Sequence, residues 1–146
     1  MTEREPLRVV LDTSVLVAAA RSKRGASFAL VSSIPSPLFK PCLSVALYLE
    51  WREVLTRAEH LPAGLTAADA EGFIRYLASQ SHLQEVHFLW RPYLRDANDD
   101  MVLEVALAAS CRHIITHNVS HFEGSAALGV EALTPGEFRR RIESER

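Results

Sequence analysis

The chain has 146 residues, of which 48% are hydrophobic and 23% charged, a balance that is typical of a folded globular protein and excludes an intrinsically disordered chain. Its 16 basic and 18 acidic residues leave a net charge of −2, so no overall positive field marks it as a nucleic-acid binder. Any such contact must be local. The length predicts one domain, residues 1–146.

The first residues and the cysteines indicate the compartment. Residues 1–6 carry charges of both signs, and the apolar run that follows is interrupted by Asp12, so neither a signal peptide nor a membrane span is predicted. The two cysteines, Cys42 and Cys111, are isolated in apolar surroundings, which is typical of buried thiols in a reducing environment. We therefore expect a cytoplasmic protein with no membrane contact.

The first element is a buried strand over residues 7–11, followed by a run that can be helical from Val15. Asp12 lies between them. Aspartate is a favoured helix N-cap, so Asp12 could accept a hydrogen bond from a backbone N–H near Ser14 or Val15. It could also be functional, because a carboxylate at the carboxyl end of a buried strand lies where open α/β sheets bind ligands.

A polar, basic loop follows at residues 21–25, where Arg21, Lys23 and Arg24 are candidate contacts for RNA phosphates. A helix is predicted over residues 26–33. A short strand is predicted over residues 38–41, kept short by the prolines at its two ends.

An amphipathic helix is predicted over residues 43–57, and Glu50 falls within its apolar stripe. An acidic side chain is rarely buried among core positions unless it has a partner. Pairing with Arg52 or Arg57, or a place at the edge of the stripe that reaches water, would explain this position structurally, whereas convergence with Asp12 would explain it functionally. The next helix, over residues 66–80, starts with Thr66 and nearby acids, and an edge strand is predicted over residues 83–89.

A helix rich in good helix formers is predicted over residues 101–110, and Asp100 falls on its inner side at the first turn. Acids at a helix start are also stabilised by the helix dipole, but Asp96 and Asp99 can satisfy that explanation without Asp100.

The last part of the chain predicts a strand centred on Ile114 and Ile115, a polar turn containing Asn118, a strand over residues 130–133 and a helix over residues 135–143. Alternating strands and helices predict a parallel sheet covered on both faces. Asp12 and Asn118 would then emerge at the same sheet edge, with Glu50 and Asp100 facing it from helices.

At this point the chain resembles the PIN domain family, in particular its bacterial toxin components of toxin–antitoxin pairs. Four segments carry the resemblance in order: VVLDTSVLV at residues 9–17, LYLEWREVL at 47–55, RDANDDMVLE at 95–104 and IITHNVSHF at 114–122. The resemblance implies a three-layer α/β/α domain with a central parallel sheet of four to five strands.

The resemblance also implies a metal-dependent endoribonuclease whose acidic cluster holds Mg²⁺ or Mn²⁺ and whose products carry a 5′-phosphate and a 3′-hydroxyl. The implied catalytic residues are Asp12, Glu50, Asp100 and Asn118. The implied metal ligands are Asp12, Glu50 and Asp100, with Asp99 competing for the third place. The hydroxyls expected to orient ligands or water are those of Thr13, Ser14 and Thr116.

Two positions depart from the family pattern, because Asn118 and His121 stand where acids are common, and lost negative charge weakens a second metal site. The partners implied are RNA, a cognate antitoxin protein that would insert a segment into the acidic pocket, and a second copy of the chain in a homodimer.

Three alternatives compete with this interpretation. Zinc binding by His113, His117 and His121 is disfavoured because a strand pattern lies between them and no H-E-x-x-H occurs. A phosphatase using Asp12 would want an acid two residues later, where Ser14 stands. The third alternative is a PIN-like binding module with weak or no catalysis.

Overall fold

A computed structural model describes residues 5–87 and 93–144. Within it, one five-stranded sheet has the strand order β3-β2-β1-β4-β5, and each recorded strand pairing is parallel. The strands are β1 (Leu7–Leu11), β2 (Phe39–Leu43), β3 (His82–Leu83), β4 (His113–Ile115) and β5 (Glu131–Leu133). The sheet is the parallel sheet predicted from the alternation of strands and helices.

Strand β1 is the centre of this sheet. It pairs with β2 on one side, with Val9 opposite Pro41, and with β4 on the other, with Leu11 opposite Ile115. Val9, Val10 and Leu11 are at most 1% exposed, because both faces of the strand are covered. The carboxyl ends of β1 and β4 therefore lie next to each other.

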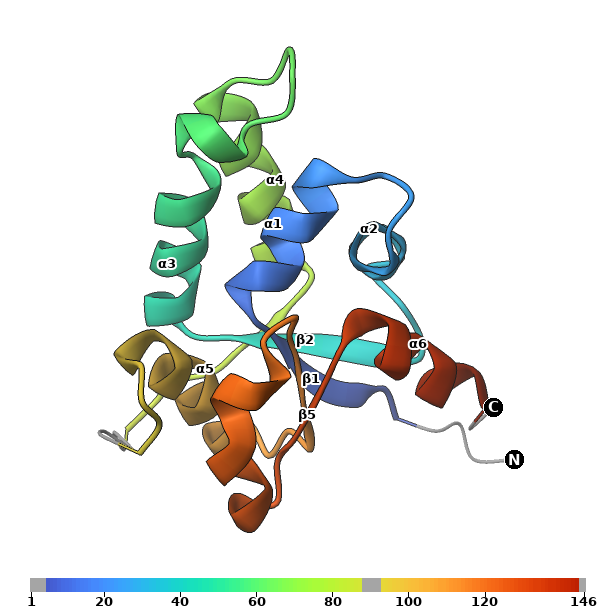
Figure 1. The fold of residues 1–146 in the computed structure, drawn as a ribbon, viewed down its shortest axis with the longest axis vertical. Coiled ribbons are helices and arrows are strands. Elements are labelled where there is room, and N and C mark those ends of the chain that lie inside the picture. Colours follow the sequence, from blue (N-terminus) through green and yellow to red (C-terminus); the bar gives the residue numbers. More distant parts are fainter. Residues whose placement is uncertain (1–4, 88–92, 145–146) are drawn as a thin grey trace.

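Helices cover both faces of the sheet, giving the predicted three-layer α/β/α architecture. In Figure 1, α1, α2, α3 and α4 lie on one side of the strands and α5 lies on the other. The helices are α1 (Thr13–Arg21), α2 (Ala26–Ser32), α3 (Val45–Leu55), α4 (Ala67–Ser79), α5 (Ala97–Ala108) and α6 (Pro135–Ser144), with 3-10 segments η1 (Ala58–His60) and η2 (Val119–Leu128).

Local capping explains where several helices begin and end. Thr66 and Asp69 form a capping box at the start of α4, as the sequence predicts. At the end of α5, the N–H of Cys111 donates to the carbonyl of Ala106 (2.8 Å), which is the Schellman pattern. Ser110 takes the left-handed position of this turn, with φ 57°, where glycine is the usual residue.

Some predicted boundaries were wrong. The first helix begins at Thr13, directly after Asp12, rather than at Val15, and the fifth begins at Ala97 rather than Met101. Strand β2 continues to Leu43, past Pro41. Proline is tolerated there because β3 pairs only with the two residues after it, so one side of Pro41 faces no strand.

The predicted edge strand over residues 83–89 is reduced to the two residues of β3, and its end at Phe88 and Leu89 lies outside the described residues. The segment η2 was not predicted, because its polar and small residues lack a helical apolar stripe. Both cysteines are buried and free, as expected. In the described part of the chain, no helix is long and apolar enough to cross a membrane.

Candidate active site

Asp12 lies at the carboxyl end of β1 and is 7% exposed. Its Oδ2 accepts hydrogen bonds from the hydroxyls of Ser14 (2.8 Å) and Thr116 (2.7 Å). Although Asp12 occupies the N-cap position of α1, its side chain accepts no capping bond, so the N-cap interpretation is wrong. The strand order places Thr116 beside it, because β4 is the neighbour of β1.

Glu50 lies on α3 and faces α1. Its Oε2 accepts a 2.5 Å hydrogen bond from the Thr13 hydroxyl, one residue after Asp12. Arg52 pairs with Glu71 and Arg57 with Glu53, so the predicted structural pairing of Glu50 with either arginine is wrong.

The pKa of the Glu50 carboxyl is raised, first because the half-buried group loses solvation. The Thr13 hydrogen bond opposes this rise, and the negative charges of Asp12 and Asp96 add to it. Glu50 therefore feels the charge of Asp12, which lies on a different element.

The two adjacent acids on α5 have different surroundings. Asp100 is 1% exposed and accepts hydrogen bonds from the backbone N–H groups of Leu94 (2.7 Å) and Tyr93 (3.4 Å). These contacts hold the segment that leads into α5. Asp100 thus has a structural role that the sequence did not indicate.

Asp99 instead shares the environment of the first two acids. Its pKa is raised to about 6, first by burial, then by the charges of Asp12 and Asp96, with a further contribution from Glu50. His121 lowers it, because Nδ1 lies 3.5 Å from Asp99 Oδ2. The structure therefore couples Asp12, Glu50 and Asp99 electrostatically, from three separate elements.

Asp96 is a further acid at this site. It caps α5 by accepting the N–H of Asn98 (2.9 Å), and its charge raises the pKa of both Glu50 and Asp99. Sequence reasoning gave Asp96 only a role at the helix start. Its place at the start of an acid-rich helix was the signal that could have indicated a role in the electrostatics of the site.

Asn118 follows β4 and is exposed. Its backbone N–H donates to Thr116 Oγ1 (2.9 Å), while its side chain makes no hydrogen bond with any described residue.

Ser14 Oγ lies 3.4 Å from Thr116 Oγ1 and accepts the N–H of His117 (3.1 Å). The three predicted orienting hydroxyls therefore all contact the acidic cluster or one another.

The three histidines of the zinc alternative go to three different partners. His113 lies in β4, with Nε2 3.6 Å from Glu131. His117 Nε2 lies 2.6 Å from Ser27 Oγ, and His121 lies beside Asp99.

Comparison with known protein families identifies the family to which this fold belongs. A family model described as the PIN domain matches residues 8–120, which contain every element that carries an acid of this site. The chain belongs to the PIN domain family. A search of curated proteins found no match. PIN domains are generally metal-dependent nucleases, so the family supports a nuclease-type site at this edge of the sheet.

The donor chemistry of this PIN domain fits a hard divalent cation. Asp12, Glu50 and Asp99 offer carboxylate oxygens, the ligands that Mg²⁺ and Mn²⁺ prefer. The raised pKa of Glu50 and Asp99 indicates carboxylates without a strong counter-charge. Within residues 5–87 and 93–144, however, no three acidic, histidine or cysteine side chains lie close enough to hold one ion. The acids are neighbours rather than a closed ligand shell.

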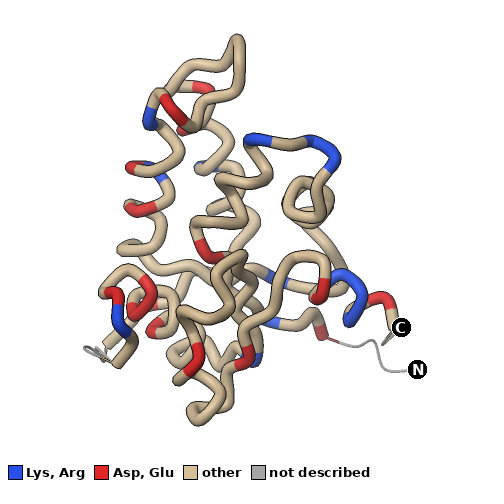
Figure 2. Tube along the Cα trace, viewed as in Figure 1, with Lys and Arg blue, Asp and Glu red and all other residues tan. Residues whose placement is uncertain are grey.

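The predicted RNA contacts lie at the other end of α1. Arg21, Lys23 and Arg24 are exposed where α1 ends, whereas Asp12 precedes its first residue. Nine helical residues span about 14 Å. Figure 2 shows this separation, with basic residues at the upper end of α1 and its loop and an acidic residue where the helix begins. The structure does not bring the basic loop into the acidic cluster.

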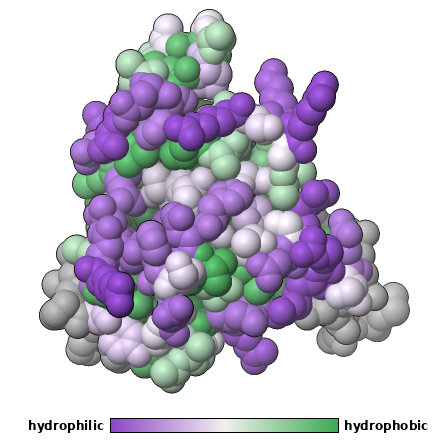
Figure 3. Space-filling model, viewed as in Figure 1, coloured by the Kyte–Doolittle hydropathy of each residue, from purple (hydrophilic) through white to green (hydrophobic). Residues whose placement is uncertain are grey.

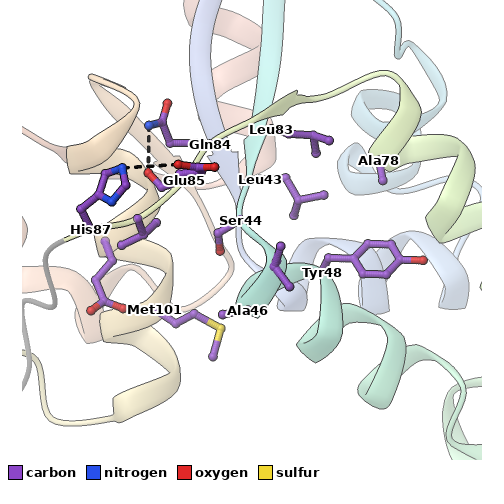
Figure 4. Close-up of a pocket in the computed structure, with 13 residues that line it drawn as sticks. Leu43, Ser44, Ala46, Tyr48, Ala78, Leu83, Gln84, Glu85, His87 and Met101 are labelled. Atoms are coloured by element: carbon purple, nitrogen blue, oxygen red, sulfur yellow. Dashed lines mark hydrogen bonds and ion pairs between the residues drawn. The ribbon is translucent and has the colours of Figure 1, made fainter.

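Two hollows among the described residues are lined by groups other than Asp12, Glu50 and Asp99. One, of about 790 Å³, is lined by the end of β2, the start of α3, β3 and α5, and includes Leu43, Tyr48 and Met101 (Figure 4). The other, of about 440 Å³, lies between α1, α2, η1 and α4 and includes Leu16, Phe28 and Phe73. Both have apolar linings, which suits protein segments better than a phosphate backbone.

Proposed function

We propose that this PIN domain is an Mg²⁺- or Mn²⁺-dependent endoribonuclease that hydrolyses RNA phosphodiester bonds. The observation that carries the proposal is that Glu50 binds the hydroxyl of Thr13, the residue directly after Asp12, while the charges of Asp12 and Glu50 both act on Asp99. Hydroxyl groups, not arginines or lysines, provide the recorded side-chain hydrogen bonds to Asp12 and Glu50. The site therefore keeps its negative potential for a cation.

The cation's ligands would be Asp12, Glu50 and Asp99, while Asp100 maintains the turn before α5. A bound divalent cation would supply an activated water and neutralise charge on the leaving oxygen. The protein's own contribution is to orient the carboxylates that would bind the cation. Ser14 and Thr116 hold one oxygen of Asp12, and Thr13 holds one oxygen of Glu50, so both carboxylates present a defined face to the cation.

Substrate contacts would be distributed along α1. Arg21, Lys23 and Arg24 would contact the RNA backbone away from the cut bond, because they lie a helix length from Asp12. Asn118, exposed at the end of β4, would offer its amide to the substrate near the reacting phosphate. The products would carry a 5′-phosphate and a 3′-hydroxyl.

The biological role we propose is that of the toxin in a toxin–antitoxin pair. The hollow between α1, α2, η1 and α4 could seat an apolar segment of an antitoxin, because Leu16 and Leu55 line it on the same two helices that carry Thr13 and Glu50. Hydrophobic atoms are exposed at the upper end of the face in Figure 3, beside strongly hydrophilic side chains. Such a segment could extend an arginine toward the acids. A homodimer is proposed as the assembly.

The test is incubation of the purified protein with labelled RNA and Mg²⁺ or Mn²⁺, alongside Asp12→Asn and Asp99→Asn. We expect cleavage by the wild type and losses of several orders of magnitude in both variants. Asp69→Asn, at an exposed acid on α4, is the matched control and should leave cleavage unchanged. Equal cleavage by wild type and Asp12→Asn would indicate a contaminating nuclease and contradict the proposal.

A non-catalytic binding module is the second candidate function. It is favoured by the open arrangement of the acids and by Asn118 and His121, which stand where relatives often have acids. RNA binding without cleavage in either metal would support it. The antitoxin is tested separately, by co-expression with the product of the neighbouring reading frame; a failure to co-purify would count against that partner.

A further inference from the structure

His117 is held at the rim of the acidic cluster by two contacts. Its ring Nε2 lies 2.6 Å from the hydroxyl of Ser27, a 2% exposed residue in the first turn of α2. Its backbone N–H donates to Ser14 Oγ, which in turn donates to Asp12. The backbone of His117 is therefore linked to Asp12 through one hydroxyl, and its ring is held by Ser27, while its second nitrogen, Nδ1, contacts no described residue.

His121 borders the same cluster at Asp99. It lies in the first turn of η2, where its backbone N–H donates to the Asn118 carbonyl (2.9 Å). Its ring Nδ1 lies 3.5 Å from Asp99, and its side chain is 55% exposed. The ring Nε2 contacts no residue in the described ranges, so it is open to a ligand.

An RNA phosphate at this site would face carboxylates from several directions. The charged groups that act most on Glu50 and Asp99 in the described chain are other carboxylates and His121. The basic loop after α1 is too distant to compensate. A phosphate needs hydrogen-bond donors beside it, and the His117 and His121 rings can add N–H donors to the Asn118 amide.

We infer that His117 and His121 bind phosphate groups of the RNA backbone on the two sides of the bond that is cut. The inference rests on the proposed function and adds the residues that hold its substrate. His117 would contact the phosphate nearer Asp12, and His121 the phosphate nearer Asp99. Ser27 would be a positioning residue, because its hydroxyl fixes the His117 ring from a helix that does not otherwise reach the site.

The test is the affinity for a short single-stranded RNA, measured by fluorescence anisotropy in Mg²⁺ in an Asp12→Asn background that cannot cleave. We expect His117→Ala and His121→Ala each to raise Kd about tenfold, the range of a lost hydrogen bond to a charged group. In the cleaving protein the same variants should raise KM and change kcat little. Ser27→Ala keeps the His117 imidazole but removes the hydroxyl that holds it. It should therefore raise KM by less than His117→Ala does.

His87→Ala is the matched control, because His87 is an exposed histidine paired with Glu85 near β3. It should change neither Kd nor KM. Unchanged Kd in both rim variants, or an equal change in His87→Ala, overturns the inference even if the wild type cleaves RNA. If the wild type cleaves no RNA but His117→Ala and His121→Ala each weaken RNA binding tenfold, the proposed nuclease activity is contradicted. The proposed contacts between the histidines and the RNA phosphates are then still supported. Melting temperatures of all variants separate these outcomes from misfolding.

Discussion

Replacing Asp99 by asparagine should stabilise the metal-free protein while removing its proposed activity. Asp99 is the acid whose pKa is raised most clearly, to about 6, because its side chain is 13% exposed and faces the charges of Asp12 and Asp96. An asparagine of nearly the same shape carries no charge, so it removes both the desolvation cost and the repulsion.

The sign and size of the expected change in stability follow from the difference between the folded and unfolded pKa of Asp99. Asp99 has an ordinary pKa of 3.8 in the unfolded chain and about 6 in the folded protein, so the folded state retains its proton longer and stability falls as pH rises from about 4 to about 6. A difference of about 2 corresponds to about 3 kcal/mol at 1.36 kcal/mol per pKa unit. Solvent and salt screening reduce this, and we expect about 1–2 kcal/mol above pH 6.

Urea denaturation in EDTA at pH 7 and at pH 4 provides the assay. Asp99→Asn should raise the free energy of unfolding at pH 7, and the gain should largely disappear at pH 4, where the wild-type carboxyl is protonated. Asp69→Asn should behave oppositely at pH 7, because the capping box with Thr66 lowers the pKa of Asp69. A destabilised Asp99→Asn at pH 7, or the same gain at both pH values, would refute the reasoning.

Further substitutions test the structural roles. Asp100→Asn should lower stability by about 1–3 kcal/mol in urea denaturation, because a neutral amide oxygen is a weaker acceptor than the carboxylate for the N–H groups of Tyr93 and Leu94. Ser110→Gly should raise the melting temperature, with a gain of about 1 kcal/mol from relief of the positive φ. Thr66→Ala should lower stability by about 1 kcal/mol through loss of the capping box, and unchanged unfolding curves would contradict that role.

The sequence predicted the fold class well because its strands are short apolar runs separated by helices. β1 was placed correctly because residues 7–11 are apolar except for Arg8, and the run Val9–Leu11 suits a strand covered on both faces. Boundaries failed where tertiary contacts override local preference. Pro41 lies inside β2 because the neighbouring strand stops short of it, and a single sequence does not show how far a neighbour extends.

The sequence indicated where Asp12 and Glu50 would lie, and their role as a catalytic site stays a prediction. Asp12 and Glu50 were placed facing one edge because strand ends and helix stripes follow simple periodicities. The surroundings of Asp99 and Asp100 differ because of how the first turn of α5 is rotated, with Asp100 accepting the N–H of Leu94. A single sequence does not show that rotation. The Ser27–His117 contact joins residues 90 positions apart, so no local pattern could indicate it.

The central position of β1 has a consequence for synthesis of the chain. One side of β1 is paired once β2 has formed, but the other must wait for β4, and about 70 residues separate Leu43 from His113. At about 5–20 residues per second, a ribosome needs roughly 4–14 s to make them. During that interval the nascent protein exposes an open edge of its innermost strand, and the hydroxyl of Thr116 that will hold Asp12 has not yet been made.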